Sequence, residues 1–434
     1  MKLRSRSKDS LSAKRCHKAL YLAPAAAFVW TGAHAQEVFI PPVEFRDRVT
    51  TVEQASTNWL GSASAPPLQA PATGPNTRPL QVGPVRFHPH LGYQVIYGDG
   101  ILQGEGNPQT TVLHTITPGA FLELGPNWNL DLTASINRYS NAELNNNEGY
   151  YLSLRGHVPL EKWLLDFGYL GNMTEQPQVE TGGQTLQNTH VVTASGVYNY
   201  QTRLSLELSA LMDARLAEDF SDYWTWSTLE WLNYQATSKT TLGLGAGAGY
   251  NFVDSGPDWT FEQVQGRVVW LPAAKLSVQA TAGVQFQQFN GESSDGTAAA
   301  SGTETFPLFG AAIAYRLFEQ TSLSLSANHT IGNAYEDDRF SEVTIVDAGV
   351  RQRLFEHISL DVVPAYNFRK YKSSLPGLAV EREDEYFSIY CGLSTVLFQK
   401  LNVAVFYQYT DNDSDDAGLS FVSRQVGARI EYRY

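Results

Sequence analysis

Ala428-Arg429-Ile430-Glu431-Tyr432-Arg433-Tyr434, the last stretch of the sequence, alternates apolar with charged side chains and ends on an aromatic ring. Successive side chains of a β-strand point to opposite faces, so this stretch has one apolar face and one polar face. The same period of two runs through 204–215, 276–287 and 358–369. Such strands can cross a bilayer only as a closed barrel, in which every backbone group is paired. The sequence therefore predicts an all-β fold, a transmembrane antiparallel up-and-down β-barrel.

The spacing of the turns predicts the number of strands. Alternation persists over about ten residues or more per segment, beyond the five or six usual in soluble sheets. Short turns recur near 125–127, 159–162, 200–202, 237–239, 272–274, 318–320, 356–357 and 399–400. Longer loops rich in Gly, Asn and Asp lie between them, as in bacterial barrels. Eight such turns predict about 18 strands over residues 87–434, with roughly 16 as the alternative.

The N-terminus has the three parts of a secretory signal peptide. Residues 1–18 contain seven Lys or Arg and one Asp, residues 19–30 are apolar, and Ala33-His34-Ala35 is a small-x-small cleavage site. The apolar run is too short for a transmembrane helix, which needs about 20 residues. We therefore expect residues 1–35 to be removed on export.

Charge and cysteine content argue against a nucleic-acid-binding protein and against a protein stabilised by internal disulfides. The chain has a formal net charge of −13, and removal of the basic leader makes the remainder more acidic. A nucleic-acid partner is therefore not expected, because phosphate binding needs a clustered basic surface. Cys391 is the one cysteine after the leader, so the exported chain cannot form an internal disulfide. Its face also holds Phe387, Ile389 and Leu393, which indicates an apolar filler and not a metal ligand.

Residues 36–86 differ in composition from the rest of the chain. Proline is scattered through this segment among Ala, Ser, Thr and Gln, with few regularly spaced apolar residues. Such a composition cannot build a core, and it predicts a proline-rich, largely disordered periplasmic arm. An arm that folds into the pore as a plug is the alternative.

Two parts of the sequence resemble known proteins. The final strand is similar to the C-terminal signature that the barrel assembly machinery recognises, which implies that machinery as a partner. Over residues 87–434, strands that enter on turns such as Leu317–Leu325 and Leu397–Val403 resemble bacterial outer-membrane β-barrel proteins of the β-barrel porin family 2 type. The resemblance implies placement in the outer membrane of the Gram-negative cell envelope. It transfers no functional residue.

Charged residues of both signs alternate with the apolar faces. If the apolar faces point to lipid, these residues line the lumen, where they would orient small polar solutes. The alternative is that they pair across neighbouring strands and only keep the lumen wetted or closed. The candidate pore-lining residues are Arg155, Asp166, Glu207, Asp213, Arg215, Arg351, Arg353, Asp361, Arg369 and Arg429.

The sequence contains no convincing catalytic, cofactor or metal site. His329 falls on the apolar side of its segment, with no nucleophile or orienting acid beside it. Gly243, Gly245, Gly247 and Gly249 recur at period two, which predicts a smooth lumen stripe or a bend in the wall and not a phosphate-binding loop. We expect no enzymatic activity, no cofactor and no bound metal.

These features favour transport over the other functions considered. A barrel of this size is wide enough for an aqueous channel unless something fills it. We therefore expect a porin-like channel for passive diffusion of small hydrophilic solutes, surrounded by outer-membrane lipid and lipopolysaccharide. The alternative is a non-conducting barrel, acting as an adhesin, as a structural protein, or as the outer-membrane exit of a polysaccharide secretion system.

Overall fold

The computed structural model describes residues 80–102, 106–218, 220–290, 303–336, 338–355, 357–375, 382–398 and 400–434. The expected signal peptide and nearly all of the expected periplasmic arm lie outside these residues, and both stay predictions. Among the described residues, no helix is long and apolar enough to span a membrane.

All regular elements in the described residues are β-strands. Their bounds are β1 Leu80–Val82, β2 Val85–Leu102, β3 Pro108–Leu124, β4 Trp128–Tyr139, β5 Asn147–Pro159, β6 Trp163–Pro177, β7 Gln184–Gln201, β8 Leu204–Ala217, β9 Tyr223–Thr237, β10 Thr240–Val253, β11 Asp258–Ala273, β12 Leu276–Asn290, β13 Thr303–Phe318, β14 Thr321–Asn333, β15 Arg339–Leu354, β16 Ile358–Ser373, β17 Arg382–Leu397, β18 Leu401–Ser414 and β19 Phe421–Arg433.

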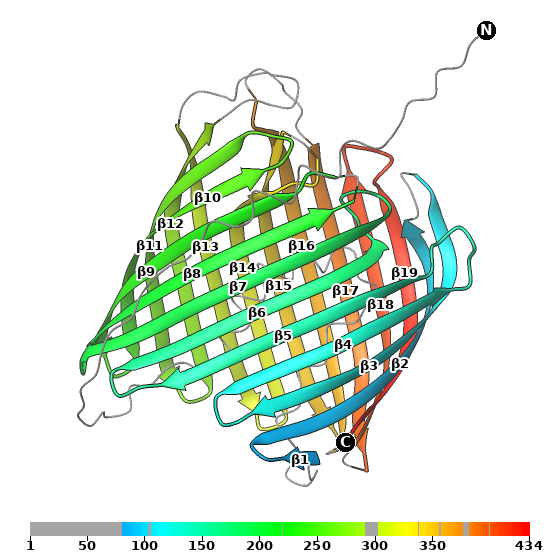
Figure 1. Ribbon diagram of the computed structural model, residues 1–434, viewed down its shortest axis with the longest axis horizontal. Helices are drawn as coiled ribbons and strands as arrows, with labels where there is room; N and C mark the ends of the chain where they lie inside the picture. Colours follow the sequence, from blue (N-terminus) through cyan, green and yellow to red (C-terminus); the bar gives the residue numbers. More distant parts are fainter. Residues whose placement is uncertain are drawn as a thin grey trace. The chain divides into compact units, whose positions relative to one another are not determined.

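The strands form one closed antiparallel barrel (Figure 1). Each strand from β2 to β19 pairs with the next in sequence, and β19 pairs with β2, with Arg433 opposite His90 and Arg424 opposite Asp99. The ring therefore has 18 strands, which confirms the predicted fold class and strand number. The short β1 forms a hairpin with the start of β2 and lies at the same end as the C-terminus (Figure 1).

Connections of two lengths separate the two ends of the barrel. The end that carries the C-terminus has short turns, such as Gly125–Asn127 between β3 and β4, and we call it the short-turn end. The opposite, long-loop end has the longer connections, including 178–183 between β6 and β7 and 334–338 between β14 and β15. This alternation of short and long connections follows the sequence prediction.

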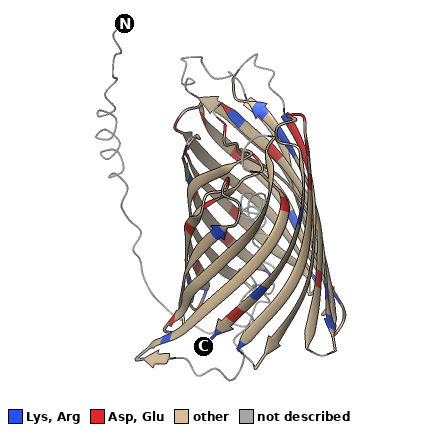
Figure 2. Ribbon diagram, turned by 90° about the vertical axis from the view of Figure 1, so that its right-hand side faces the viewer, with Lys and Arg blue, Asp and Glu red and all other residues tan. Residues whose placement is uncertain are grey.

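Side-chain alternation gives each strand an outer and an inner face. Large apolar side chains such as Leu244, Leu232 and Val405 are exposed on the outer face. The inner face is rich in Ser, Thr, Asn, Gln and Gly, it also holds aromatic rings such as Trp231 and Phe261, and charged residues are dispersed along the strands (Figure 2). Because a membrane-spanning barrel places apolar side chains in lipid and polar ones in the lumen, the two faces are those of a transmembrane barrel.

Two turns at the short-turn end carry a strained aromatic residue. Phe355 and Phe398 have φ of 49° and 52°, in the left-handed region that residues other than glycine rarely adopt. Their side chains are 86% and 89% exposed. Exposed aromatic residues at the ends of membrane-spanning strands are those expected of an interfacial aromatic girdle.

Candidate functional site

The ten candidate pore-lining residues lie on the strand faces opposite to the exposed apolar side chains. Glu207 alternates with exposed Leu208, Arg351 with exposed Val350, and Arg429 with exposed Ile430. The same alternation holds for the other candidates, which are Arg155, Asp166, Asp213, Arg215, Arg353, Asp361 and Arg369. All ten side chains therefore leave the backbone on the lumen side, and their role as pore-lining residues stays a prediction.

Several of these residues form ion pairs along the wall. Arg267 on β11 donates to Glu207 on β8 at 2.7 Å, and its guanidinium lies 4.2 Å from the ring centroid of Trp231 on β9. Arg351 donates to Asp361 at 2.6 Å across the β15–β16 pair. At Glu207, Arg351 and Asp361, therefore, opposite charges pair with one another along the wall. From the sequence alone, such pairing was the alternative to free charges that orient solutes.

The loop between β6 and β7, at the long-loop end, folds toward the inner face of the barrel and contributes a buried acid. The Glu180 side chain is only 5% exposed, and its Oε2 accepts a hydrogen bond from Arg369 Nη1 on β16 at 2.5 Å. Glu180 Oε1 accepts from the backbone N–H of Tyr335 at 2.6 Å. One carboxylate therefore joins two loops and the wall of the barrel.

The loop between β14 and β15 crosses toward β7 and β8. The Tyr335 ring lies beneath the Arg215 guanidinium, 3.6 Å from centroid to Cζ, and its hydroxyl donates to Gln187 Oε1 at 2.5 Å. Arg215 also donates to the carbonyl oxygen of Ala334 at 2.7 Å. Burial raises the pKa of Tyr335, against the opposing effect of Arg215, so the hydroxyl stays protonated and keeps its role as donor.

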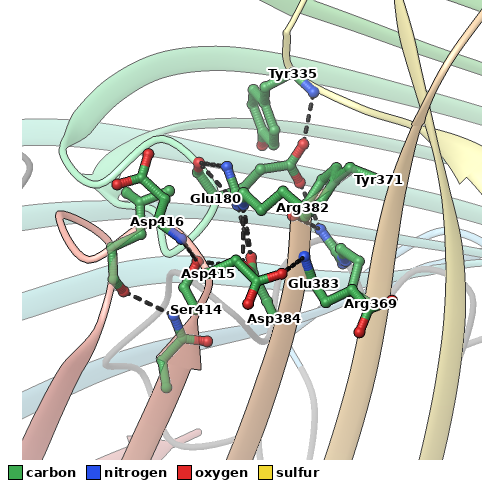
Figure 3. Close-up of polar contacts among 12 residues, drawn as sticks. Glu180, Tyr335, Arg369, Tyr371, Arg382, Glu383, Asp384, Ser414, Asp415 and Asp416 are labelled. Carbon is green, nitrogen blue, oxygen red and sulfur yellow. Dashed lines mark hydrogen bonds and ion pairs between the residues drawn. The ribbon is translucent and has the colours of Figure 1, made fainter. Parts of the chain in front are cut away.

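The start of β17 completes the cluster (Figure 3). Arg382 donates to Asp384 Oδ2 at 2.6 Å, and its guanidinium lies 4.1 Å from the ring centroid of Tyr371 on β16. Both terminal nitrogens of Arg382 also approach the Glu180 carbonyl oxygen, at 3.4 Å each. We call Glu180, Tyr335, Arg215, Arg369, Tyr371, Arg382 and Asp384 the mouth cluster.

Further contacts anchor the β14–β15 connection across the barrel. Asn333 at the end of β14 exchanges side-chain hydrogen bonds with Asn251 on β10, at 2.7 and 3.0 Å. Phe340 at the start of β15 is buried against Phe289 and Phe306, with ring centroids 5.2 and 5.6 Å apart. The ends of the connection are therefore held by polar contacts at Asn333 and by aromatic packing at Phe340.

The sequence revealed only part of the mouth cluster. Arg215 and Arg369 were candidates because they alternate with apolar neighbours. Glu180 and Tyr335 lie in loops, where alternation gives no information, and Arg382 is the first residue of β17, directly after a loop. One signal in the sequence could have revealed Arg382: it shares the period-two face of Asp384 and Tyr386, so that face continues to the start of the strand.

Two other sequence predictions concern glycine and histidine. The stripe of glycines on β10 makes room for inward rings: a Cβ on Gly245 would lie 2.8 Å from the Trp231 indole, and one on Gly249 would lie 2.2 Å from Phe261. His329 lies on the outer face, stacked on Phe309 with ring centroids 5.0 Å apart. Among the described residues, no group of three or more His, Cys, Asp or Glu is placed to hold a metal ion.

Comparison with known proteins yields only distant similarity. No protein-family model matches the chain, and no curated protein is a significant relative. Among solved structures, the chain is similar to Acinetobacter baumannii OccAB2, with 11% identity, a TM-score of 0.43 and coverage of 80% of this chain and 98% of that one.

Two transporters are similarly distant. The copper transporter OprC has 10% identity and a TM-score of 0.43, with 77% of this chain and 62% of that one covered. The ferric citrate transporter FecA has 10% identity and a TM-score of 0.41, with 76% and 60% covered. The chain thus spans less than two thirds of either transporter. Such distant similarity assigns neither a family nor a solute, so the resemblance to β-barrel porin family 2 stays a prediction.

Proposed function

We propose that this protein is an outer-membrane channel for passive diffusion of small hydrophilic solutes, with its long-loop end outside the cell. The observation that carries the proposal is the division of each strand into an exposed apolar face and a polar inner face around a closed ring of 18 strands. A ring of this size encloses an aqueous lumen when its inner face is polar. The mouth cluster then sets the upper size limit for solutes at the external end.

Single-channel conductance in planar bilayers tests the proposal. The wild-type protein is expected to open steady channels. Glu180→Ala removes the carboxylate that joins the two loops to Arg369, so we expect the constriction to loosen and conductance to rise. Glu143→Ala, which changes an exposed acid in the β4–β5 loop, is the matched control and should leave conductance unchanged.

The opposite results would contradict the proposal. A protein that folds into a heat-modifiable barrel in detergent and yet shows no current in many insertions would favour the non-conducting alternative. Equal conductance in wild type and Glu180→Ala would be compatible with a diffusion channel, but it would contradict the proposal that the mouth cluster limits the size of the solutes.

A further inference from the structure

The wall of the barrel is split between β13 and β14 at the long-loop end. The two strands pair in register from the short-turn end up to Phe309 opposite His329, where the pairing stops. Beyond that point, residues 303–308 of β13 pair with β12 and residues 330–333 of β14 pair with β15. Among the described strands, neither stretch has a partner on its other side. The ring is therefore continuous at its short-turn end and has two free strand edges here.

Beyond the split, the start of β15 lies inside the barrel. Phe340 shares the period-two face of Val346, which is exposed on the outer face. Phe340 is nevertheless fully buried, packed against Phe289 of β12 and Phe306 of β13. Both of these rings are on the inner face of their strands. The outer face of the start of β15 therefore lies against the inner face of the neighbouring wall.

The tip of the same hairpin reaches strands far around the ring. Asn333 exchanges side-chain hydrogen bonds with Asn251 on β10, and the Tyr335 hydroxyl donates to Gln187 on β7. Glu180 accepts from the backbone N–H of Tyr335 (Figure 3). We call residues 330–333 and 339–343, with their connection, the inward hairpin. It crosses the lumen at the long-loop end, so a solute that enters there must pass beside it.

Pro307 lies in the free edge of β13. Proline has no N–H to donate to a ladder of hydrogen bonds, and within sheets it is confined to edges, strand starts and bulges. If the register continued, Leu308 would lie opposite Thr330 and Pro307 would lie opposite Ile331. The pairing ends at Phe309, just before it would reach the proline. The position of Pro307 therefore accounts for the place where β14 leaves the wall.

The side chains of the inward hairpin are suited to the inside of the barrel. Glu342 shares a face with exposed Val346, and Lys372 of β16 shares one with exposed Tyr366, so a continued wall would present both charges to the membrane. They form an ion pair with each other, and Lys372 Nζ lies 5.5 Å from the ring centroid of Phe306 on the inner wall. Placement in the lumen thus keeps these charges out of lipid.

We infer that the inward hairpin is the size-selecting element of the channel, and that Pro307 is the positioning residue that keeps it in the lumen. The inference rests on the proposed channel function and names the segment that determines which solutes pass. The mouth cluster holds the tip of the hairpin, whereas Pro307 acts at its base. An N–H donor in place of the proline allows β13 and β14 to pair further, which draws the hairpin out of the lumen and into the wall.

Disulfide trapping tests the position of the hairpin. In a Cys391→Ser background, Leu308→Cys and Thr330→Cys lie directly opposite each other only if the pairing extends beyond Phe309. Cysteines at opposed positions of neighbouring strands are close enough to form a disulfide, and cysteines on separated strands are not. We expect no disulfide while Pro307 is present, and a disulfide once Pro307→Thr is added.

The positive control is the pair Ala312→Cys and Ser326→Cys, which are opposed in the existing β13–β14 ladder and should cross-link with or without Pro307→Thr. Single-channel conductance with poly(ethylene glycol) of graded size measures the size limit. Pro307→Thr should raise the conductance and admit larger polymers. Pro364→Thr is the matched change in β16, which pairs with β15 on both sides of Pro364, and it should leave the size limit unchanged.

A second variant reaches the same result by another route. Phe340→Ala keeps Pro307 and removes the aromatic anchor of the inward hairpin, so it should also admit larger polymers. Heat-modifiable migration on a gel shows that each variant has folded into a barrel. If neither folded variant changes the size limit, the inward hairpin is not the size-selecting element.

The trapping results can overturn the inference in two further ways. A disulfide between Leu308→Cys and Thr330→Cys while Pro307 is present would show that the hairpin is not held in the lumen. No disulfide after Pro307→Thr would show that the proline does not position it. Absence of current in every folded variant would instead contradict the proposed function itself, and the trapping, which is read on a gel, would still locate the hairpin.

Discussion

Glu230 is the residue that departs most clearly from the two-faced pattern. It lies at the centre of β9, on the same face as exposed Trp226, Leu232 and Tyr234. Its neighbours across the strands are Leu208 and Ala246. A carboxylate at this depth faces hydrocarbon, which is unfavourable for a charged or polar group. Its alternation with Trp231 and Leu229 places it on the outer face, and nothing in the pattern of side chains explains a charged group there.

We expect Glu230→Leu to stabilise the barrel by about 1 kcal/mol, because it replaces a lipid-facing acid with an apolar side chain. Urea unfolding in lipid vesicles measures the free energy of unfolding. Glu143→Leu, which changes an acid in an exposed loop, is the control and should give no gain. A loss of stability in Glu230→Leu would mean that this position faces a polar partner in the membrane and not lipid.

Strand β10 shows how glycine determines which rings can enter the lumen. Gly245 lies under the Trp231 indole on the inner face, whereas Gly266 on β11 lies on the outer face with its nearest atom 3.9 Å from an added Cβ. The sequence predicted the face of the β10 stripe. It could not predict the use of that space, because the ring that fills it comes from the preceding strand.

Gly245→Ala is expected to lower the free energy of unfolding by about 1–3 kcal/mol, since the new methyl group would displace the Trp231 ring from a tightly packed site. Gly266→Ala is the matched change on the outer face and should be neutral or slightly stabilising, because alanine restricts the unfolded chain. Thermal unfolding in detergent compares the two. Equal effects would show that the space above Gly245 is not needed by Trp231.

At the scale of the whole molecule, the ring of strands could be predicted from the sequence, whereas the mouth cluster could not. Successive side chains of a strand alternate between its two faces whatever the rest of the chain does, so the period of two and the turn composition sufficed to predict the strands and the short turns. The mouth cluster depends on contacts between distant segments: Glu180 and Arg369 are 189 residues apart. No local pattern encodes which loop folds inward, because that choice depends on packing among loops and wall that only the closed barrel brings together.

Pairing of charges around the lumen predicts weak ion selectivity. In a potassium chloride gradient, the reversal potential of the wild-type channel is expected to lie near zero. Arg267→Gln removes the cation that pairs with Glu207, so the lumen becomes more negative and the channel should shift toward cation selectivity. The shift should grow at low ionic strength, where screening is weaker. Strong anion selectivity of the wild type would contradict this account of the wall.

The seam between β2 and β19 has a consequence for biogenesis. It joins segments from the two extremes of the barrel sequence, so the backbone of Arg424 hydrogen-bonds to Asp99, 325 positions earlier. Pairing between segments so far apart in sequence is slow to form. The backbone hydrogen-bonding groups at the outer edges of β2 and β19 stay unpaired until both strands have been synthesised and have reached the membrane. A truncated polypeptide would retain two open edges prone to aggregation, which makes the terminal strand a checkpoint for completeness.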